Sequence, residues 1–129
     1  MPVLNPHHDL NALHARLKQA HNLIVACYCA AWCDTCTEYQ PSFNALAARW
    51  PQHTFVWIDI EENADLLGEE DVENFPTLLI QGERGNLFYG ALLPHIEHLE
   101  RLIRHMNDDT PFIERGPAAL QTLLAPAAQ

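Results

Sequence analysis

Residues 23–36 read LIVACYCAAWCDTC, an apolar run that leads directly into two cysteines spaced C-x-x-C. The run from Leu23 to Cys29 shows no polar alternation, which is typical of a central strand in a sheet covered on both faces. From Asp34 to Trp50 the apolar residues recur at helical spacing, and Pro41 inside this segment removes a backbone donor. The stretch therefore predicts a buried strand that turns into a helix, with a kink of that helix near Pro41.

The first cysteine of the pair lies where a thiol becomes reactive. We expect Cys33 near the N-terminus of the helix, where unpaired amides and the helix dipole favour the thiolate. Cys36 follows nearly one turn later, at a separation where small adjustments allow a disulfide. In this arrangement Cys33 would attack a target disulfide, and Cys36 would resolve the resulting mixed disulfide.

The remaining segments predict one α/β domain around this unit. Helices are expected from residue 10, over 64–72 and over 94–106, and strands over 54–60, 77–81 and 87–89. This order favours a central mixed sheet flanked by helices on both faces, in which the last two strands pair as an antiparallel hairpin. We predict a domain over residues 1–107, followed by a weakly packed Pro/Ala-rich extension over 108–129.

Composition narrows the classes of function. The chain has 129 residues, of which 48% are hydrophobic and 19% charged, so one globular domain is expected. The net charge of -10 has the wrong sign for binding phosphate backbones or anionic lipid. Nucleic acid and membrane surfaces are therefore excluded as expected partners.

The spacing of the cysteines also indicates the cellular compartment of the protein. All four, at positions 27, 29, 33 and 36, fall in one ten-residue window, whereas a disulfide framework would spread them along the chain. The longest apolar stretch, from Leu23 to Cys33, is shorter than the roughly 18 residues of a membrane span, and the first residues lack a signal-peptide pattern. We expect a reducing compartment, hence a cytoplasmic protein.

Several motifs together resemble the thioredoxin family. Trp32-Cys33-Asp34-Thr35-Cys36 is similar to the family's Trp-Cys-Gly-Pro-Cys, and Pro41 falls where its active-site helix is kinked. Phe75-Pro76-Thr77 resembles the family's cis-proline segment, and Gly90-Ala91 matches the small pair before its last helix. The resemblance covers about residues 8 to 106.

This resemblance implies a thioredoxin fold, with Pro76 cis and facing the two cysteines. It implies a redox-active Cys33–Cys36 disulfide, no bound cofactor, and a substrate groove formed around Phe75, Pro76 and Gly90. Trp32, beside the exposed thiol, would cover the site and meet substrates. The partners implied are disulfide-containing client proteins and an electron donor similar to thioredoxin reductase.

Three departures from the family pattern affect the chemistry. Cys27 replaces a buried Asp that is thought to help move the proton of the second cysteine, and a thiol is a poor base there. Trp57 replaces the Lys that partners this Asp, so an apolar pair stands in place of an ion pair. Asp34 adds a negative charge beside Cys33, which opposes the thiolate.

Other interpretations stay open. Cys27 and Cys29 are expected to be buried thiols that act as small hydrophobes. Alternatively, Cys27 would alter the environment beneath Cys36, and Cys29 would be a slower redox or regulatory thiol. The four cysteines would also suit a metal site, although their placement on one strand and one helix start is unusual for one. A thioredoxin-fold binding or chaperone-like module with a vestigial site is the alternative function.

Overall fold

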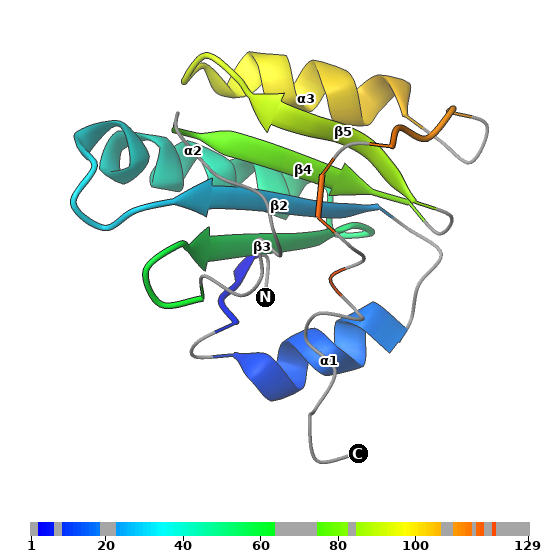
Figure 1. The fold of residues 1–129 in the computed structure, drawn as a ribbon, viewed down its shortest axis with the longest axis horizontal. Coiled ribbons are helices and arrows are strands. Elements are labelled where there is room, and N and C mark those ends of the chain that lie inside the picture. The colour runs from blue at the N-terminus through cyan, green and yellow to red at the C-terminus, as the bar shows by residue number, and fades with distance from the viewer. Residues whose placement is uncertain are drawn as a thin grey trace.

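A five-stranded mixed sheet forms the centre of the computed structural model (Figure 1), which describes residues 3–6, 9–18, 23–63, 75–82, 85–106, 110–114, 116–117 and 120. The strands are β1 (Val3–Leu4), β2 (Ile24–Cys29), β3 (Thr54–Asp59), β4 (Thr77–Gln81) and β5 (Asn86–Ala91). Their order is β1-β3-β2-β4-β5, with β3 parallel to both β1 and β2. Strand β4 pairs antiparallel with β2 and with β5, which confirms the predicted hairpin.

Helices cover both faces of the sheet, as the sequence predicts. The helices are α1 (Leu10–Lys18), α2 (Asp34–Arg49) and α3 (Ile96–His105). One core cluster joins the sheet to α2 and α3, through residues such as Phe43 and Leu99. A second cluster joins the opposite face to α1, through Leu13 and Leu17. The sheet therefore lies between α1 on one face and α2 and α3 on the other (Figure 1).

Strand β2 lies at the middle of the sheet because its residues are apolar on both sides. Ala26 and Tyr28 face the α1 layer, whereas Val25, Cys27 and Cys29 face the α2 layer. All five of these side chains are buried. The alternation of faces along a strand thus directs two of the four cysteines toward α2.

The limits of several elements differ from those expected. The two-residue strand β1 was not predicted, and β5 is longer than the expected strand over 87–89. Helix α2 continues through Pro41 and ends at Arg49, close to its predicted end. The helix predicted over 64–72 lies outside the described residues.

The C-terminal extension contacts the sheet where it is described. Ile113 donates its backbone N–H to the carbonyl of Asn86, with an N···O distance of 2.7 Å. Leu120 is fully buried in the α1 layer, and Gln81 accepts its backbone N–H at 3.0 Å. Ile113 and Leu120 are thus each held by a hydrogen bond from their backbone N–H, and Leu120 also by burial of its side chain. The weak packing expected of the extension as a whole stays a prediction. The predicted boundary at residue 107 stays a prediction.

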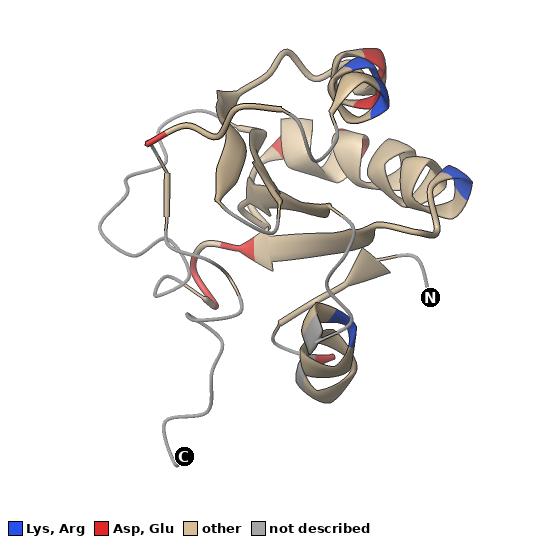
Figure 2. Ribbon diagram, turned by 90° about the vertical axis from the view of Figure 1, so that its right-hand side faces the viewer, with Lys and Arg blue, Asp and Glu red and all other residues tan. Residues whose placement is uncertain are grey.

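Basic side chains are absent from the strands and loops that the structure describes. The Lys and Arg residues whose side chains the structure describes lie on the three helices, at positions 16, 49, 101 and 104 (Figure 2). Glu100 links α3 to α2 by accepting hydrogen bonds from Arg49 and from the indole of Trp50. Its pKa is lowered, chiefly by the hydrogen bond from Arg49.

Candidate redox site

Cys33 lies at the junction of strand and helix, as predicted. Strand β2 ends at Cys29, and the chain then turns, with the N–H of Cys33 donating to the carbonyl of Ala30 at 3.1 Å. Cys33 is the N-cap residue of α2 and has extended backbone angles, φ -90° and ψ 119°. Its carbonyl accepts the N–H of Thr37 at 3.1 Å and the hydroxyl of Thr37 at 3.3 Å. Its sulfur is thus carried at the first turn of the helix.

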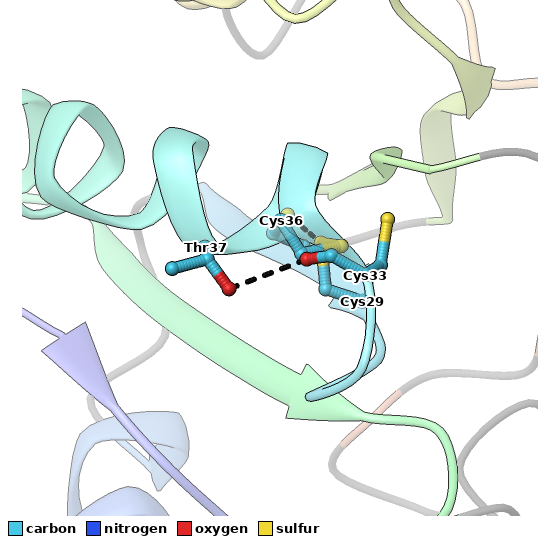
Figure 3. Close-up of a disulfide and its surroundings, with 5 residues drawn as sticks. Cys29, Cys33, Cys36 and Thr37 are labelled. Atoms are coloured by element: carbon cyan, nitrogen blue, oxygen red, sulfur yellow. Dashed lines mark hydrogen bonds between the residues drawn. A yellow bond between two sulfur atoms is a disulfide. The ribbon is translucent and has the colours of Figure 1, made fainter.

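The disulfide in the structure joins Cys29 to Cys36, and Cys33 is a free thiol (Figure 3). Both bridged cysteines are buried, whereas Cys33 is half-buried. The side chain of Cys33 points away from the bridge (Figure 3). The predicted Cys33–Cys36 pairing is therefore not the pairing in this structure, and the expectation that Cys29 is an unpaired small hydrophobe was wrong.

Local geometry explains this pairing. The turn at Ala30–Trp32 folds the first turn of α2 back over the end of β2, so that Cys36 faces the sheet. Cys29 faces α2 from the last position of that strand, and the two Cα atoms are 5.8 Å apart. This separation lies within the usual range for disulfides. The signal for Cys29 was present in the sequence, because it shares the strand face of Val25 and Cys27.

Cys27 lies directly behind this bridge. Its sulfur is 3.8 Å from the sulfur of Cys29, and its side chain is fully buried. Burial raises the pKa of the Cys27 thiol well above its ordinary value. The thiol therefore stays protonated at neutral pH and cannot act as the base that a carboxylate would provide.

The residues around Cys27 are apolar, as the departures from the family pattern predict. Trp57 is its direct neighbour on β3, and the Trp57 ring meets the ring of Phe43 with centroids 5.6 Å apart. Tyr39 of α2 is buried, and its hydroxyl has no hydrogen-bond partner among the described residues. Burial also raises the pKa of Tyr39. The layer beneath α2 thus contains neutral groups around the sulfurs.

An exposed aromatic pair lies next to Cys33. Trp32 is 66% exposed, and its ring meets the ring of Phe75 edge to face, with centroids 5.6 Å apart. The peptide bond between Phe75 and Pro76 is cis, which confirms what the resemblance implies. Gly90 pairs with Leu78, which in turn pairs with Cys27 across β4 and β2. The roles of Pro76 and Gly90 in substrate binding stay predictions.

The two aspartates near the site differ in their contacts. Asp34 is exposed in the first turn of α2, and its effect on the Cys33 thiolate stays a prediction. Asp59, at the end of β3, accepts the backbone N–H of Glu61 at 2.8 Å and so anchors the loop that follows this strand. The described residues contain no group of three His, Cys, Asp or Glu side chains arranged to hold a metal ion. They also contain no helix that is long and apolar enough to span a membrane.

Comparison with known proteins agrees with this geometry. The thioredoxin family model matches residues 6–103. A thioredoxin from Ophiophagus hannah is 31% identical over 99 residues, which cover 74% of this chain and 91% of that protein. A putative thioredoxin H10 from Arabidopsis thaliana is 36% identical over 67 residues, and the match spans 50% of this chain and 44% of that protein.

Solved structures show the same fold. A crystal structure of a thioredoxin from Nicotiana alata aligns with a TM-score of 0.70 and 27% identity, covering 83% of this chain and 94% of that one. A thioredoxin from Fasciola hepatica aligns with a TM-score of 0.65 and 26% identity, covering 82% of this chain and 100% of that one. The mixed sheet and the cis Phe75–Pro76 bond are consistent with these matches, whereas the Cys29–Cys36 pairing differs from the one that the resemblance implies. The chain belongs to the thioredoxin family and carries the site of a thiol-disulfide oxidoreductase.

Proposed function

We propose that this protein reduces disulfides of client proteins through Cys33 as nucleophile and Cys36 as resolving cysteine. The observation that carries the assignment is the difference in exposure among the four sulfurs. Cys33 is a free and accessible thiol at the N-terminus of α2, whereas Cys27, Cys29 and Cys36 are buried. A client disulfide can therefore reach Cys33 before it reaches any of the other three sulfurs.

The chemistry consists of two thiol–disulfide exchanges. The thiolate of Cys33 attacks one sulfur of the client disulfide, which forms a mixed disulfide and releases the other client sulfur as a thiolate. The thiolate of Cys36 then attacks the sulfur of Cys33 and releases the second client thiolate. The client gains two electrons, and a transient Cys33–Cys36 disulfide forms. No bound cofactor takes part in either step.

The exposed pair formed by Trp32 and Phe75 supports a protein substrate. Two aromatic rings beside the nucleophile provide an apolar surface on which an extended segment of a client can lie. We include the buried Pro76 and the half-buried Gly90 in this substrate site, because Pro76 directly precedes β4 and Gly90 lies opposite Leu78 near the same end of β4. An electron donor similar to thioredoxin reductase would restore the dithiol. Because the four cysteines are clustered rather than spread as a disulfide framework, we also propose that the protein acts in the cytoplasm.

Trapping of client proteins tests the two roles. In the Cys36→Ser variant, attack by Cys33 survives but resolution does not, so mixed disulfides with clients should accumulate. The matched Cys33→Ser variant should trap few clients. Non-reducing electrophoresis followed by mass spectrometry measures both. Equal trapping by the two variants would show that these roles are misassigned.

A binding or chaperone-like module remains the second candidate. The buried pair of Cys27 and Trp57 favours it, because no described carboxylate lies beneath Cys36 to accept its proton. The reduction of insulin by dithiothreitol separates the two functions. Catalytic acceleration by substoichiometric protein supports the oxidoreductase, whereas protection of insulin from precipitation without acceleration supports the module.

A further inference from the structure

The oxidised protein in this structure keeps its accessible cysteine free, because the bridge lies between two buried sulfurs. We propose that Cys29 is a third redox cysteine, which takes the disulfide over from Cys33 after each attack on a client and stores it as the Cys29–Cys36 bridge. This inference rests on the proposed function, since Cys33 must first react with a client. It adds a step that the C-x-x-C pair alone cannot perform.

Cys36 is placed to exchange with both neighbours. It lies in the first turn of α2, three positions after Cys33, which is the N-cap residue of this helix. It also lies over the end of β2, bonded to Cys29 with a Cα–Cα distance of 5.8 Å. The sulfur of Cys36 thus has an accessible neighbour at the N-cap of its helix and a buried partner at the end of β2.

The added step is a single internal exchange. When Cys33 and Cys36 are bridged, the sulfur of Cys29 attacks the sulfur of Cys36. The Cys29–Cys36 bond forms, the Cys33–Cys36 bond breaks, and Cys33 leaves as a thiolate. The proton of Cys29 is taken up by the departing Cys33 sulfur. The protein holds one disulfide before and after the step, so no external oxidant or reductant is needed.

Solvation gives this exchange its direction. A free thiol that is buried cannot exchange hydrogen bonds with water, whereas a free thiol at an accessible position can. The exchange moves the free sulfur from the buried position 29 to the half-buried position 33. The buried bridge is therefore favoured over a bridge that would leave an unpaired thiol at Cys29.

Cys27 has a positioning role in this step. Its sulfur is 3.8 Å from the sulfur of Cys29, close enough for a hydrogen bond between them. Because burial keeps Cys27 protonated, its S–H can donate to Cys29 as negative charge develops there. This second buried sulfur thus lowers the cost of the attack at a position where the side chain is removed from water.

We call this internal exchange from the Cys33–Cys36 bridge to the Cys29–Cys36 bridge the relay. It gives the oxidised protein a second property, the retention of bound clients. With Cys36 held in the buried bridge, the free Cys33 can still attack a client disulfide. The mixed disulfide then persists, because the resolving sulfur is occupied. The reduced protein would release its clients, whereas the oxidised protein would retain them until the bridge is reduced.

Disulfide mapping after a single oxidation tests the relay. The reduced protein is mixed with one equivalent of glutathione disulfide, sampled over time, alkylated with iodoacetamide while folded, and then acid-quenched. Chymotrypsin cleavage after Tyr28, Trp32 and Tyr39 gives the peptides 29–32 and 33–39. A Cys33–Cys36 bridge lies within the second peptide, whereas a Cys29–Cys36 bridge joins the two and leaves Cys33 alkylated.

The relay predicts a change of bridge with time. The Cys33–Cys36 bridge should appear first and should then be replaced by the Cys29–Cys36 bridge. In the Cys29→Ala variant the first bridge should persist, and alkylation of Cys33 in the oxidised protein should fall by about tenfold or more. Cys27→Ala, which removes the neighbouring sulfur on the same strand face, is the matched control and should slow the change without altering the final bridge.

The outcomes separate the relay from the proposed function. If the wild-type protein stops at the Cys33–Cys36 bridge and Cys33 stays protected, the relay is wrong and the proposed function stands. If glutathione disulfide forms no adduct or bridge at Cys33, both are wrong. Mapping of the wild-type protein decides the matter even if the Cys29→Ala variant does not fold.

Discussion

Cys27 lies directly opposite Trp57 in the parallel pairing of β2 with β3, and both side chains pack beneath α2. The thiol is fully buried and the indole nearly so, and neither brings a charge. An apolar pair avoids the desolvation cost of a buried ion pair. The consequence is that the site has no described proton acceptor at this position, and the substitution Cys27→Asp tests what a carboxyl group would do there.

The Cys27→Asp variant should be a less stable but faster reductase. A carboxyl group beneath Cys36 can accept its proton, so resolution should accelerate. Burial without a cationic partner should cost about 2–4 kcal/mol of unfolding free energy. Stopped-flow reduction of a model disulfide and urea melts measure the two effects, with Cys27→Ala as the control for the lost thiol. Unchanged turnover in a folded variant would show that the proton leaves by another route.

The pH dependence of this variant has a definite sign. Burial raises the pKa of the introduced carboxyl group above its unfolded value of about 4. The unfolded chain therefore loses its proton first as the pH rises, which favours unfolding. Relative to Cys27→Ala, the variant should lose stability as the pH rises from about 4 toward neutrality. If the unfolding free energies of the two variants changed with pH in the same way, the introduced carboxyl group would be solvated rather than buried.

Much of this fold was predictable because the apolar patterns of its central elements are complete. Strand β4 was predicted residue for residue, and β2 and α2 to within one residue at an end. Strand β1 was missed because two residues, Val3 and Leu4, carry no periodicity. It is defined by its pairing with β3 rather than by its own sequence.

The bridge was mispredicted for a physical reason. The C-x-x-C spacing satisfies the rule for neighbours on a helix, and this rule concerns one element only. The position of Cys29 depends on the angle at which the turn at residues 30–32 returns α2 over β2. Sequence spacing does not encode that angle, so the three-dimensional structure is needed to show that Cys29 lies within bonding distance of Cys36.

Trp32 should matter for protein clients more than for stability. It is 66% exposed, so the Trp32→Ala variant should change the unfolding free energy by only about 0.5 kcal/mol. Loss of its ring from the pair with Phe75 should slow insulin reduction severalfold and slow reduction of glutathione disulfide much less.

A second exposed aromatic residue provides the control. Phe112 is 56% exposed and lies beside Gly85, at the end of the β4–β5 hairpin away from the cysteines. Phe112→Ala should leave both reactions unchanged. Similar slowing by Trp32→Ala and Phe112→Ala would argue against a specific client surface at Trp32.

Leu120 should anchor the C-terminal extension. Its side chain is fully buried, and the side chain of Gln81 accepts its backbone N–H while donating to Asn86 at 2.8 Å. Leu120→Ala should lower the unfolding free energy by about 2–3 kcal/mol, as for other buried leucines. Urea melts measure this loss. A change within error would mean that residue 120 does not pack against the sheet in solution.

His53 should make the stability of the fold depend on pH. Its Nδ1 accepts the backbone N–H of Leu23 at 3.1 Å, its ring stacks on Trp50, and its carbonyl accepts a hydrogen bond from Arg16. The hydrogen bond from Leu23 requires a neutral imidazole, and burial lowers the pKa of His53 below its ordinary value of 6.5. The imidazole therefore binds its proton more readily in the unfolded chain than in the fold.

Stability should consequently fall as the pH drops below about 7, because the unfolded chain then holds more protons at this position. The loss should continue until the pH reaches the lowered pKa of the folded state, with a slope of at most about 1.4 kcal/mol per pH unit. His53→Gln keeps a hydrogen-bond acceptor but does not titrate. The variant should be less stable than wild type at neutral pH, and the difference should shrink toward pH 5, measured by urea melts in matched salt. A constant difference across this range would show that His53 titrates alike in the folded and unfolded chains and that the bond from Leu23 does not hold it neutral.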